Sequence, residues 1–228
     1  MWTDSCEQRL YETIGGIEVI DYEAFRELSP ASLSVFLDHS QLMNYKIRPI
    51  WPTPRSIAGP AYTVRVPRGD NMMFHYAMDK IPEGVVVVVE SGDTEYALCG
   101  SNGFQIVKRH GGEALVLDGM VREPGDAPLV GLPVFARGVV PQAAFKEAPG
   151  DLNVPIRCGG VRVFPGDVVV ASDDGVAVVP KDQAEAVLLQ AIAQQAGERD
   201  LRGHDPDERE RIHTVKHADL FAKYGRSN

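Results

Sequence analysis

The chain has 228 residues, of which 44% are hydrophobic, so it is long enough to bury the core of one large domain or two small ones. Its 32 acidic and 23 basic residues give a net charge of −9, which argues against binding the phosphate backbone of nucleic acid through bulk electrostatics. No apolar stretch approaches the length that spans a bilayer, and the N-terminus lacks a basic region followed by an apolar core. We therefore expect a cytoplasmic protein without nucleic-acid or membrane partners.

The cysteine pattern argues against disulfide bonds and against a zinc site built from thiolates. Cys6, Cys99 and Cys158 are odd in number, widely spaced and free of any C-x-x-C motif. This pattern fits neither a disulfide framework nor a thiolate zinc site. Free thiols in a reducing compartment are expected.

The first part of the chain predicts short helices followed by a strand. Helical patterns cover residues 6–13, 22–28 and 31–39, and turn signals separate them. Residues 59–66 form a β-rich run bounded by Pro and Gly, and residues 72–78 return to helical spacing.

The middle of the chain alternates strands and helices. Residues 85–90 begin with five consecutive valines, a pattern typical of a strand buried on both faces. A helix is expected over residues 100–110, and strands over 114–117 and 133–138. This alternation predicts a single α/β domain whose sheet mixes parallel and antiparallel pairs.

The last third of the chain predicts antiparallel strands and then helix. Residues 160–171 suggest a β-hairpin, and a strand follows over residues 176–179. An amphipathic helix is predicted over residues 183–195. We assign residues 1–203 to the domain and residues 204–228 to a charged C-terminal tail. The tail has little apolar area of its own, so we expect it to be ordered by packing on a partner subunit in a homo-oligomer.

The most informative segment is the apolar run 115–117, which is followed by Asp118-Gly119 and then by Arg122 and Glu123. The run predicts a buried strand, and Asp-Gly marks its end, so Arg122 and Glu123 fall on a loop held by a rigid scaffold. Arginine offers a planar donor fork suited to a carboxylate, and a neighbouring acid can hold a hard divalent cation. A solvated surface ion pair is the alternative interpretation.

A second candidate is the turn Gly100-Ser101-Asn102-Gly103 at the start of a predicted helix. Its backbone N–H groups would bind a substrate carboxylate, as helix N-termini do for anions. The alternative is an ordinary helix entry.

The histidines are expected to be packed structural residues or surface-exposed residues. His75 lies in a helical pattern between two aromatic residues, which favours a packed, hydrogen-bonded role. His204, His213 and His217 lie in the charged tail, so surface positions are expected for them.

Six short segments between about residues 32 and 202 carry a family resemblance through their order and spacing. They are Gly59-Pro60-Ala61-Tyr62-Thr63-Val64, Gly69-Asp70-Asn71 with His75 and Ala77, Asp118-Gly119-Met120-Val121-Arg122, Pro133-Val134-Phe135-Ala136-Arg137-Gly138, Pro165-Gly166-Asp167-Val168 and Asp173-Asp174-Gly175-Val176. The pattern resembles the class II pyruvate aldolases acting on 4-hydroxy-4-methyl-2-oxoglutarate and 4-carboxy-4-hydroxy-2-oxoadipate, together with the ribonuclease E activity regulator RraA. The resemblance implies an α/β/β sandwich with a swivelling-domain-like core. It also implies a trimer or hexamer with sites between subunits, and Mg²⁺ or Mn²⁺ as cofactor.

The resemblance also implies roles for individual residues. It puts Arg122 on the substrate-binding arginine, Glu123 on the metal-binding aspartate and Asp126 on a trailing acid. Three positions depart from the family pattern. Glu123 replaces the metal-binding aspartate and is one methylene longer, Ser101 replaces a leading carboxylate, and Val35 stands where an aspartate is usual.

The resemblance implies the activity of a metal-dependent lyase, which cleaves a 4-hydroxy-2-oxo acid to pyruvate or decarboxylates oxaloacetate. The metal and Arg122 would stabilise the enolate that forms, and Asp126 or Glu198 of a neighbouring subunit would act in proton transfer. The missing carboxylates leave two alternatives open: a non-catalytic, RraA-like protein-binding regulator, and a family member with an altered substrate and reaction.

Overall fold

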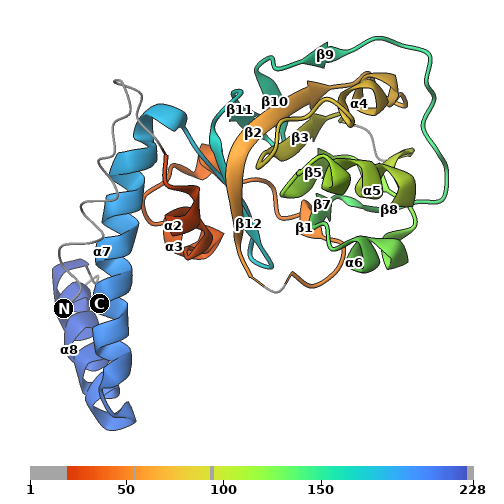
Figure 1. Cartoon of the computed structure of the whole chain (residues 1–228). Coiled ribbons are helices and arrows are strands. Elements are labelled where there is room, and N and C mark those ends of the chain that lie inside the picture. The colour runs from red at the N-terminus through yellow and green to blue at the C-terminus, as the bar shows by residue number, and fades with distance from the viewer. Residues whose placement is uncertain (1–19, 54, 93–94, 225–228) are drawn as a thin grey trace. The chain divides into compact units, whose positions relative to one another are not determined.

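A computed structural model describes residues 20–224, except 54, 93 and 94 (Figure 1). The helix expected over residues 6–13 lies outside the described residues. The chain divides into two compact units, Met1–Leu188 and Leu189–Asn228, which we describe one at a time.

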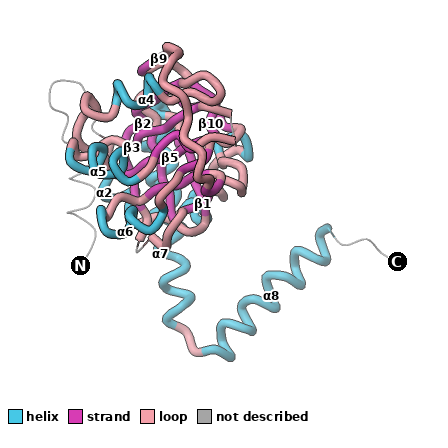
Figure 2. The backbone as a smooth tube through the Cα atoms, turned by 90° about the vertical axis from the view of Figure 1, so that its right-hand side faces the viewer, coloured by secondary structure: helices cyan, strands magenta, loops and turns pink. Residues whose placement is uncertain are grey.

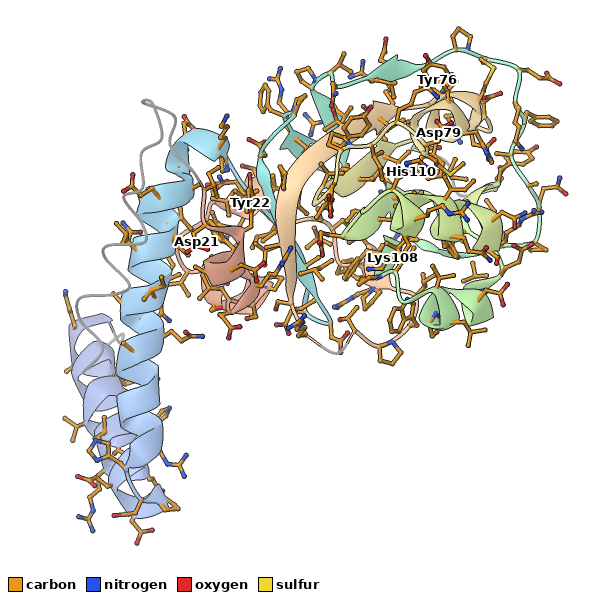
Figure 3. The ribbon with its side chains drawn as sticks, in the orientation of Figure 1. Asp21, Tyr22, Tyr76, Asp79, Lys108 and His110 are labelled. Carbon is orange, nitrogen blue, oxygen red and sulfur yellow. The ribbon has the colours of Figure 1, made fainter. Side chains whose placement is uncertain are left out.

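Short helices open the described part of the first unit, where α2 (Tyr22–Arg26), α3 (Pro30–Leu33) and the 3₁₀ turn η1 (His39–Gln41) follow one another. Asp21, labelled in Figure 3, caps α2 by accepting a 2.9 Å hydrogen bond from the Ala24 amide. The helix predicted over residues 31–39 is wrong beyond Leu33. A new cap at Asp38, whose carboxylate accepts from the Ser40 amide, starts η1 instead.

The first unit is built on an eight-stranded mixed sheet with the order β1-β7-β5-β3-β2-β12-β13, in which β9 also pairs with β2. Neighbours along β2-β3-β5-β7 run parallel, whereas β1, β9, β12 and β13 pair antiparallel. The predicted mixed sheet is therefore confirmed. The strand bounds are β1 (Arg48–Pro49), β2 (Ile57–Arg65), β3 (Val86–Glu90), β5 (Ala114–Asp118), β7 (Val134–Ala136), β9 (Asp151–Leu152), β12 (Val168–Ser172) and β13 (Gly175–Val179).

The valines of strand β3 pack into hydrophobic clusters on both faces of the sheet, so the sheet lies at the centre of the core. Val87 and Val89 join a core cluster with helices α4 (Met72–Ala77) and α5 (Ser101–Arg109). Val86 and Val88 join a second cluster with strands β10 (Ile156–Cys158) and β11 (Val161–Val163). All four valines are fully buried, as the valine run predicted. The helices and the additional strands lie on opposite faces, which confirms the expected α/β/β arrangement (Figure 2).

The hairpin predicted over residues 160–171 is wrong. Strand β11 pairs with β10, whereas β12 pairs with β2 and β13, so the two halves of the expected hairpin belong to different sheets. Asp167 fixes the turn between them, because its carboxylate accepts from the Phe164 amide at 2.8 Å and the Lys181 amide at 3.1 Å. Burial raises the pKa of this carboxyl group.

A small parallel sheet, β4-β6-β8, positions the candidate site. Its strands are β4 (Ala97–Cys99), β6 (Met120–Val121) and β8 (Gly138–Val139). Strand β4 leads directly into α5, and β6 leads into Arg122. The turn η2 (Pro124–Asp126) and helix α6 (Ala127–Val130) follow.

The C-terminal region is helical. After η3 (Lys181–Gln183), helix α7 (Ala184–Gly203) extends further than the predicted helix over residues 183–195, and α8 (Pro206–Tyr224) occupies most of the expected tail. The Asp205 carboxylate accepts from the Glu208 amide at 3.0 Å and so caps α8. The division between a domain at 1–203 and a tail at 204–228 stays a prediction.

Two further expectations concern cysteines and membranes. Cys99 and Cys158 are buried free thiols, as predicted, whereas Cys6 lies outside the described residues. Across the part of the chain that the structure describes, no helix is both long and apolar enough to cross a membrane.

Candidate functional site

The candidate site lies where β4 passes into α5 and β6 passes into the following loop. The Arg122 amide donates to the Cys99 carbonyl at 2.9 Å, so the start of the loop is tied to the end of β4. Arg122 therefore lies beside Gly100, which precedes the first residue of α5. The two segments that the sequence indicated separately meet at this junction.

The Glu123 side chain contacts both segments of the junction. Its Oε2 accepts from the Ser101 amide at 2.9 Å, and its Oε1 lies 3.4 Å from Arg122 Nε. The Arg122 and Glu123 side chains are 43% and 45% exposed. The carboxylate thus occupies the electropositive N-terminus of α5, where an anion is stabilised.

The backbone of Glu123 is unusual for a residue with a side chain. Its φ of 55° and ψ of 48° lie in the left-handed region. This conformation costs of order 1–3 kcal/mol for a residue other than glycine and tends to occur at functional sites. It turns the Glu123 side chain back toward Ser101.

Gly100 makes room for this arrangement. A Cβ atom at position 100 would lie 2.7 Å from Glu123 Oε2 and 2.9 Å from Arg122 Cγ. The φ of −146° at Gly100 is accessible to any residue, so space alone requires glycine here.

The other two residues of the predicted turn differ in their surroundings. Asn102 is exposed on the first turn of α5. Gly103 is buried, and a Cβ atom there would lie 2.3 Å from Cys99 Sγ. Gly103 therefore lets α5 pack closely on β4. Burial also raises the pKa of the Cys99 thiol, which favours its neutral form.

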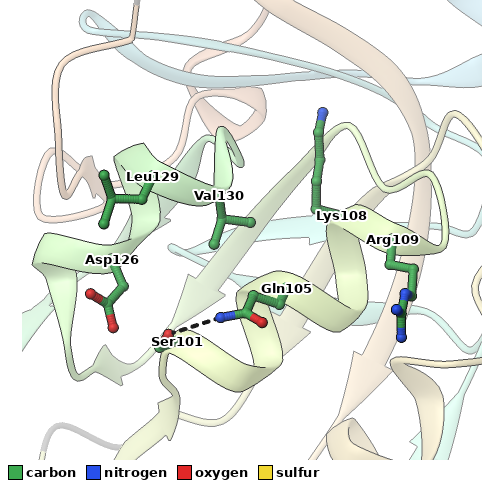
Figure 4. Close-up of a pocket in the computed structure, with 7 residues that line it drawn as sticks. All are labelled: Ser101, Gln105, Lys108, Arg109, Asp126, Leu129 and Val130. Carbon is green, nitrogen blue, oxygen red and sulfur yellow. Dashed lines mark hydrogen bonds between the residues drawn. The ribbon is translucent and has the colours of Figure 1, made fainter.

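The predicted site residues line two separate pockets. Arg122 and Glu123 line a pocket of about 340 Å³ with Val139, Val140 and Pro141. Ser101 and Asp126 line a second pocket of about 560 Å³ between α5 and α6, together with Gln105, Lys108, Arg109, Leu129 and Val130 (Figure 4). Within this chain, Asp126 therefore does not share the pocket of Arg122.

Two further positions were singled out from the sequence. Val35, at the position where the family resemblance implies an aspartate, is exposed after the end of α3. Glu198 lies in α7, and its side chain is outside the described residues.

The donor set around Arg122 fits a divalent cation only with help from other ligands. Among the described residues, no group of three His, Cys, Asp or Glu side chains could hold a metal ion. Glu123 alone offers a half-exposed carboxylate, whose oxygens keep further lone pairs beside their contacts with Ser101 and Arg122. A magnesium ion commonly uses one or two carboxylates and keeps several waters, so Glu123 fits as a single protein ligand.

His75 and Lys146 also belong to the surroundings of Arg122. The expected packed position of His75 is wrong, because the residue is exposed on α4. Partial desolvation lowers the pKa of His75, and the positive charges of Lys146 and Arg122 lower it further. The Phe145 amide donates to the Gly69 carbonyl at 2.8 Å, which holds this segment beside the start of α4. Sequence patterns did not predict this grouping, because its members come from three distant segments.

Comparison with known proteins places the chain in a family. The profile of the RraA-like family, described as Aldolase/RraA, matches residues 18–178. The chain belongs to the aldolase/RraA family. It is 36% identical over 173 residues to a protein of Halalkalibacterium halodurans named "Putative 4-hydroxy-4-methyl-2-oxoglutarate aldolase", a match that covers 75% of this chain and 82% of that protein.

Solved structures of aldolase/RraA relatives share the fold but have different names. RraAS2 of Streptomyces coelicolor, described as an unusual member of the RNase ES inhibitor RraA family, has a TM-score of 0.71 and 25% identity, with 79% of this chain and 96% of that one covered. A Geobacillus kaustophilus protein described as an S-adenosylmethionine:2-dimethylmenaquinone methyltransferase has a TM-score of 0.62 and 30% identity, with 68% and 96% covered. The family is therefore established, whereas its names do not agree on one activity.

Proposed function

We propose that this aldolase/RraA protein is a lyase that cleaves a 4-hydroxy-2-oxo acid to pyruvate or decarboxylates oxaloacetate. The observation that carries the proposal is the junction at Gly100, where Arg122 and the Ser101 amide converge on one carboxylate. A junction that holds the Glu123 carboxylate has the donors needed to hold the carboxylate of a 2-oxo acid.

Arg122 is the residue that would bind the substrate. Its guanidinium can donate two parallel hydrogen bonds to a carboxylate, and the first-turn amides of α5 add donors from the other side. In this arrangement the substrate carboxylate takes over contacts that Glu123 makes in the free protein.

Glu123 would hold a magnesium or manganese ion, with the remaining ligands coming from water and substrate. When bound, such an ion supplies Lewis-acid polarisation of the 2-oxo group. Arg122 adds positive charge at the same end of the substrate.

In retro-aldol cleavage the C3–C4 bond breaks and its electron pair forms the enolate of pyruvate. The C4 hydroxyl loses its proton and becomes a carbonyl, and the enolate then takes a proton at C3. Arg122 stabilises the negative charge that develops on the enolate. Asp126 is the candidate proton acceptor, although it lines the neighbouring pocket.

We further propose that the working protein is a cytoplasmic homotrimer or hexamer with sites between subunits. A site between subunits would allow Arg122 of one copy and an acid of another to meet at one substrate. This arrangement would account for the placement of Asp126 outside the pocket of Arg122.

A non-catalytic, RraA-like regulator is the second candidate. Its support is the pair Ser101 and Val35 at positions where the family resemblance implies acids, together with the lack of a three-ligand metal cluster among the described residues. A role in protein binding would not need carboxylates at these two positions. A changed substrate would account for their absence equally well.

Pyruvate release distinguishes these candidates. The purified protein is incubated with 4-hydroxy-4-methyl-2-oxoglutarate or oxaloacetate, in the presence of Mg²⁺, Mn²⁺ or excess chelator. The proposal predicts release with either metal and its loss with chelator. No release above the protein-free rate from either substrate would contradict the lyase and favour a binding role or a changed reaction.

A further inference from the structure

Helix α8 presents a pair of histidines that the proposed lyase site does not use. His213 and His217 are separated by one helical turn, and both are exposed. Their rings stack face to face, with centroids 3.8 Å apart and an angle of 23° between the ring planes. The helix thus brings two imidazoles together on one face.

A hydrogen bond fixes the tautomer of one of these rings. His217 Nδ1 lies 2.8 Å from the carbonyl oxygen of His213. A carbonyl oxygen only accepts, so His217 Nδ1 donates, and in the neutral ring the lone pair lies on Nε2. Histidines that bind metals commonly donate their other N–H to a backbone carbonyl in this way.

We infer that His213 and His217 form a binding site for a transition-metal ion that prefers imidazole ligands, such as Zn²⁺, Ni²⁺ or Cu²⁺. Two nitrogens bound to one tetrahedral ion at about 2.0–2.1 Å lie about 3.4 Å apart. Helix α8 holds the ring centroids 3.8 Å apart, so a rotation of the side chains about their χ torsions brings one nitrogen of each ring to this separation. The described residues supply no third side-chain ligand to form a three-ligand group, so water completes the coordination.

This site is chemically distinct from Glu123. A carboxylate beside an arginine suits a hard ion such as Mg²⁺, whereas paired imidazoles suit softer divalent ions. The inference does not depend on the proposed lyase activity. It also lies entirely within one helix of the second compact unit.

His204 provides a matched control on the same part of the chain. Its Nδ1 lies 2.9 Å from Glu208 Oε2, so it pairs with a carboxylate one turn away. Replacing His204 removes a tail histidine and leaves the stacked pair intact.

The test uses the untagged full-length protein and isothermal titration with ZnCl₂ or NiCl₂. We expect one ion bound per chain, and an affinity at least about tenfold weaker in His213→Ala and in His217→Ala, since each loses a ligand. His204→Ala should bind as the wild type does, and MgCl₂ should give no binding at this site. Alanine is the most helix-favouring residue, so α8 is expected to persist, which circular dichroism checks.

Electron paramagnetic resonance with Cu²⁺ provides a second measurement. The inference predicts nitrogen hyperfine structure from two imidazoles in the wild type. It predicts the loss of this structure in the double variant that carries both His213→Ala and His217→Ala. Unchanged zinc affinity in that double variant, or a copper spectrum from oxygen ligands alone, would overturn the inference.

Discussion

At the scale of single residues, Glu123 has the most unusual position in the candidate site. It holds a left-handed backbone conformation and places its carboxylate on the Ser101 amide beside Arg122. The sequence predicted that Arg122 and Glu123 would stand on a loop after a buried strand. It could not predict the contact with Ser101, because that contact depends on the backbone conformation at position 123.

Changing Glu123 tests whether its charge serves a metal ion. Glu123→Asp keeps a carboxylate and should preserve or raise metal-dependent pyruvate release. Glu123→Gln keeps an oxygen that accepts from the Ser101 amide but lacks the negative charge, so the dependence on Mg²⁺ should disappear along with most activity. The measurement is pyruvate release across a range of Mg²⁺ concentrations.

Two results would count against this role for Glu123. Complete loss in Glu123→Asp would mean that the longer side chain is part of a rebuilt site. An unchanged Mg²⁺ dependence in Glu123→Gln would exclude Glu123 as the metal ligand.

Asp70 is a buried carboxylate that stabilises the surroundings of the site. It is 4% exposed, and it accepts from the amides of Met72, Glu147 and Ala148 at 2.8, 2.7 and 3.1 Å. Burial opposes ionisation, but these backbone donors hold the pKa of Asp70 below its ordinary value. The carboxylate thereby joins the start of α4 to the segment around Lys146.

Asp70→Asn should lower the free energy of unfolding by about 2–3 kcal/mol, because an amide cannot accept from all three donors in the same geometry. The folded-state pKa of Asp70 lies below its unfolded-state value, so its stabilising effect is present above pH about 3.9 and is lost as the pH falls toward the folded-state pKa. The acid side of the stability curve should therefore be flatter in the variant.

Urea unfolding over a pH series measures this effect. Asp79→Asn is the control, since Asp79 is an exposed residue paired with Lys80 at the end of α4 (Figure 3). Equal stability of wild type and Asp70→Asn at neutral pH would contradict the assigned role.

At the scale of elements, the junction between β4 and α5 determines the shape of the site. Gly100→Ala should reduce pyruvate release by about tenfold or more, because the new Cβ would lie 2.7 Å from Glu123 Oε2 and displace it together with Arg122. Gly125→Ala is a matched control on the following turn, where an added Cβ meets no atom within 4 Å. Steady-state kinetics and thermal unfolding of both variants separate an effect on the site from an effect on the fold. Equal activity of the two variants would show that the space at Gly100 is not required.

The sequence predicted a fully buried strand better than it predicted the pairing of short strands. The valine run of β3 was confirmed because burial on both faces leaves a clear pattern. The hairpin over residues 160–171 was wrong because Asp167 turns the chain into another sheet. The β4-β6-β8 sheet had no sequence signal, since its strands have only two or three residues and pair across long separations.

At the scale of the whole molecule, family membership and fold are established, and activity is the open property. The sequence motifs were sufficient to identify the family, because their order and spacing follow the fold. They were insufficient to define the complete site, because Arg122 and Asp126 line separate pockets within one chain. A complete site between subunits would require residues that no single-chain pattern reveals.

The most direct test compares pyruvate release by the wild type, Arg122→Ala and Arg162→Ala with 4-hydroxy-4-methyl-2-oxoglutarate and Mg²⁺. Arg162 is the control, because it is an exposed arginine on β11 and lines neither pocket of the predicted site residues. We predict that Arg122→Ala loses at least about 100-fold in kcat/KM with an unchanged circular dichroism spectrum, whereas Arg162→Ala stays close to the wild type. Full activity in Arg122→Ala would contradict the assignment of the substrate carboxylate to this junction.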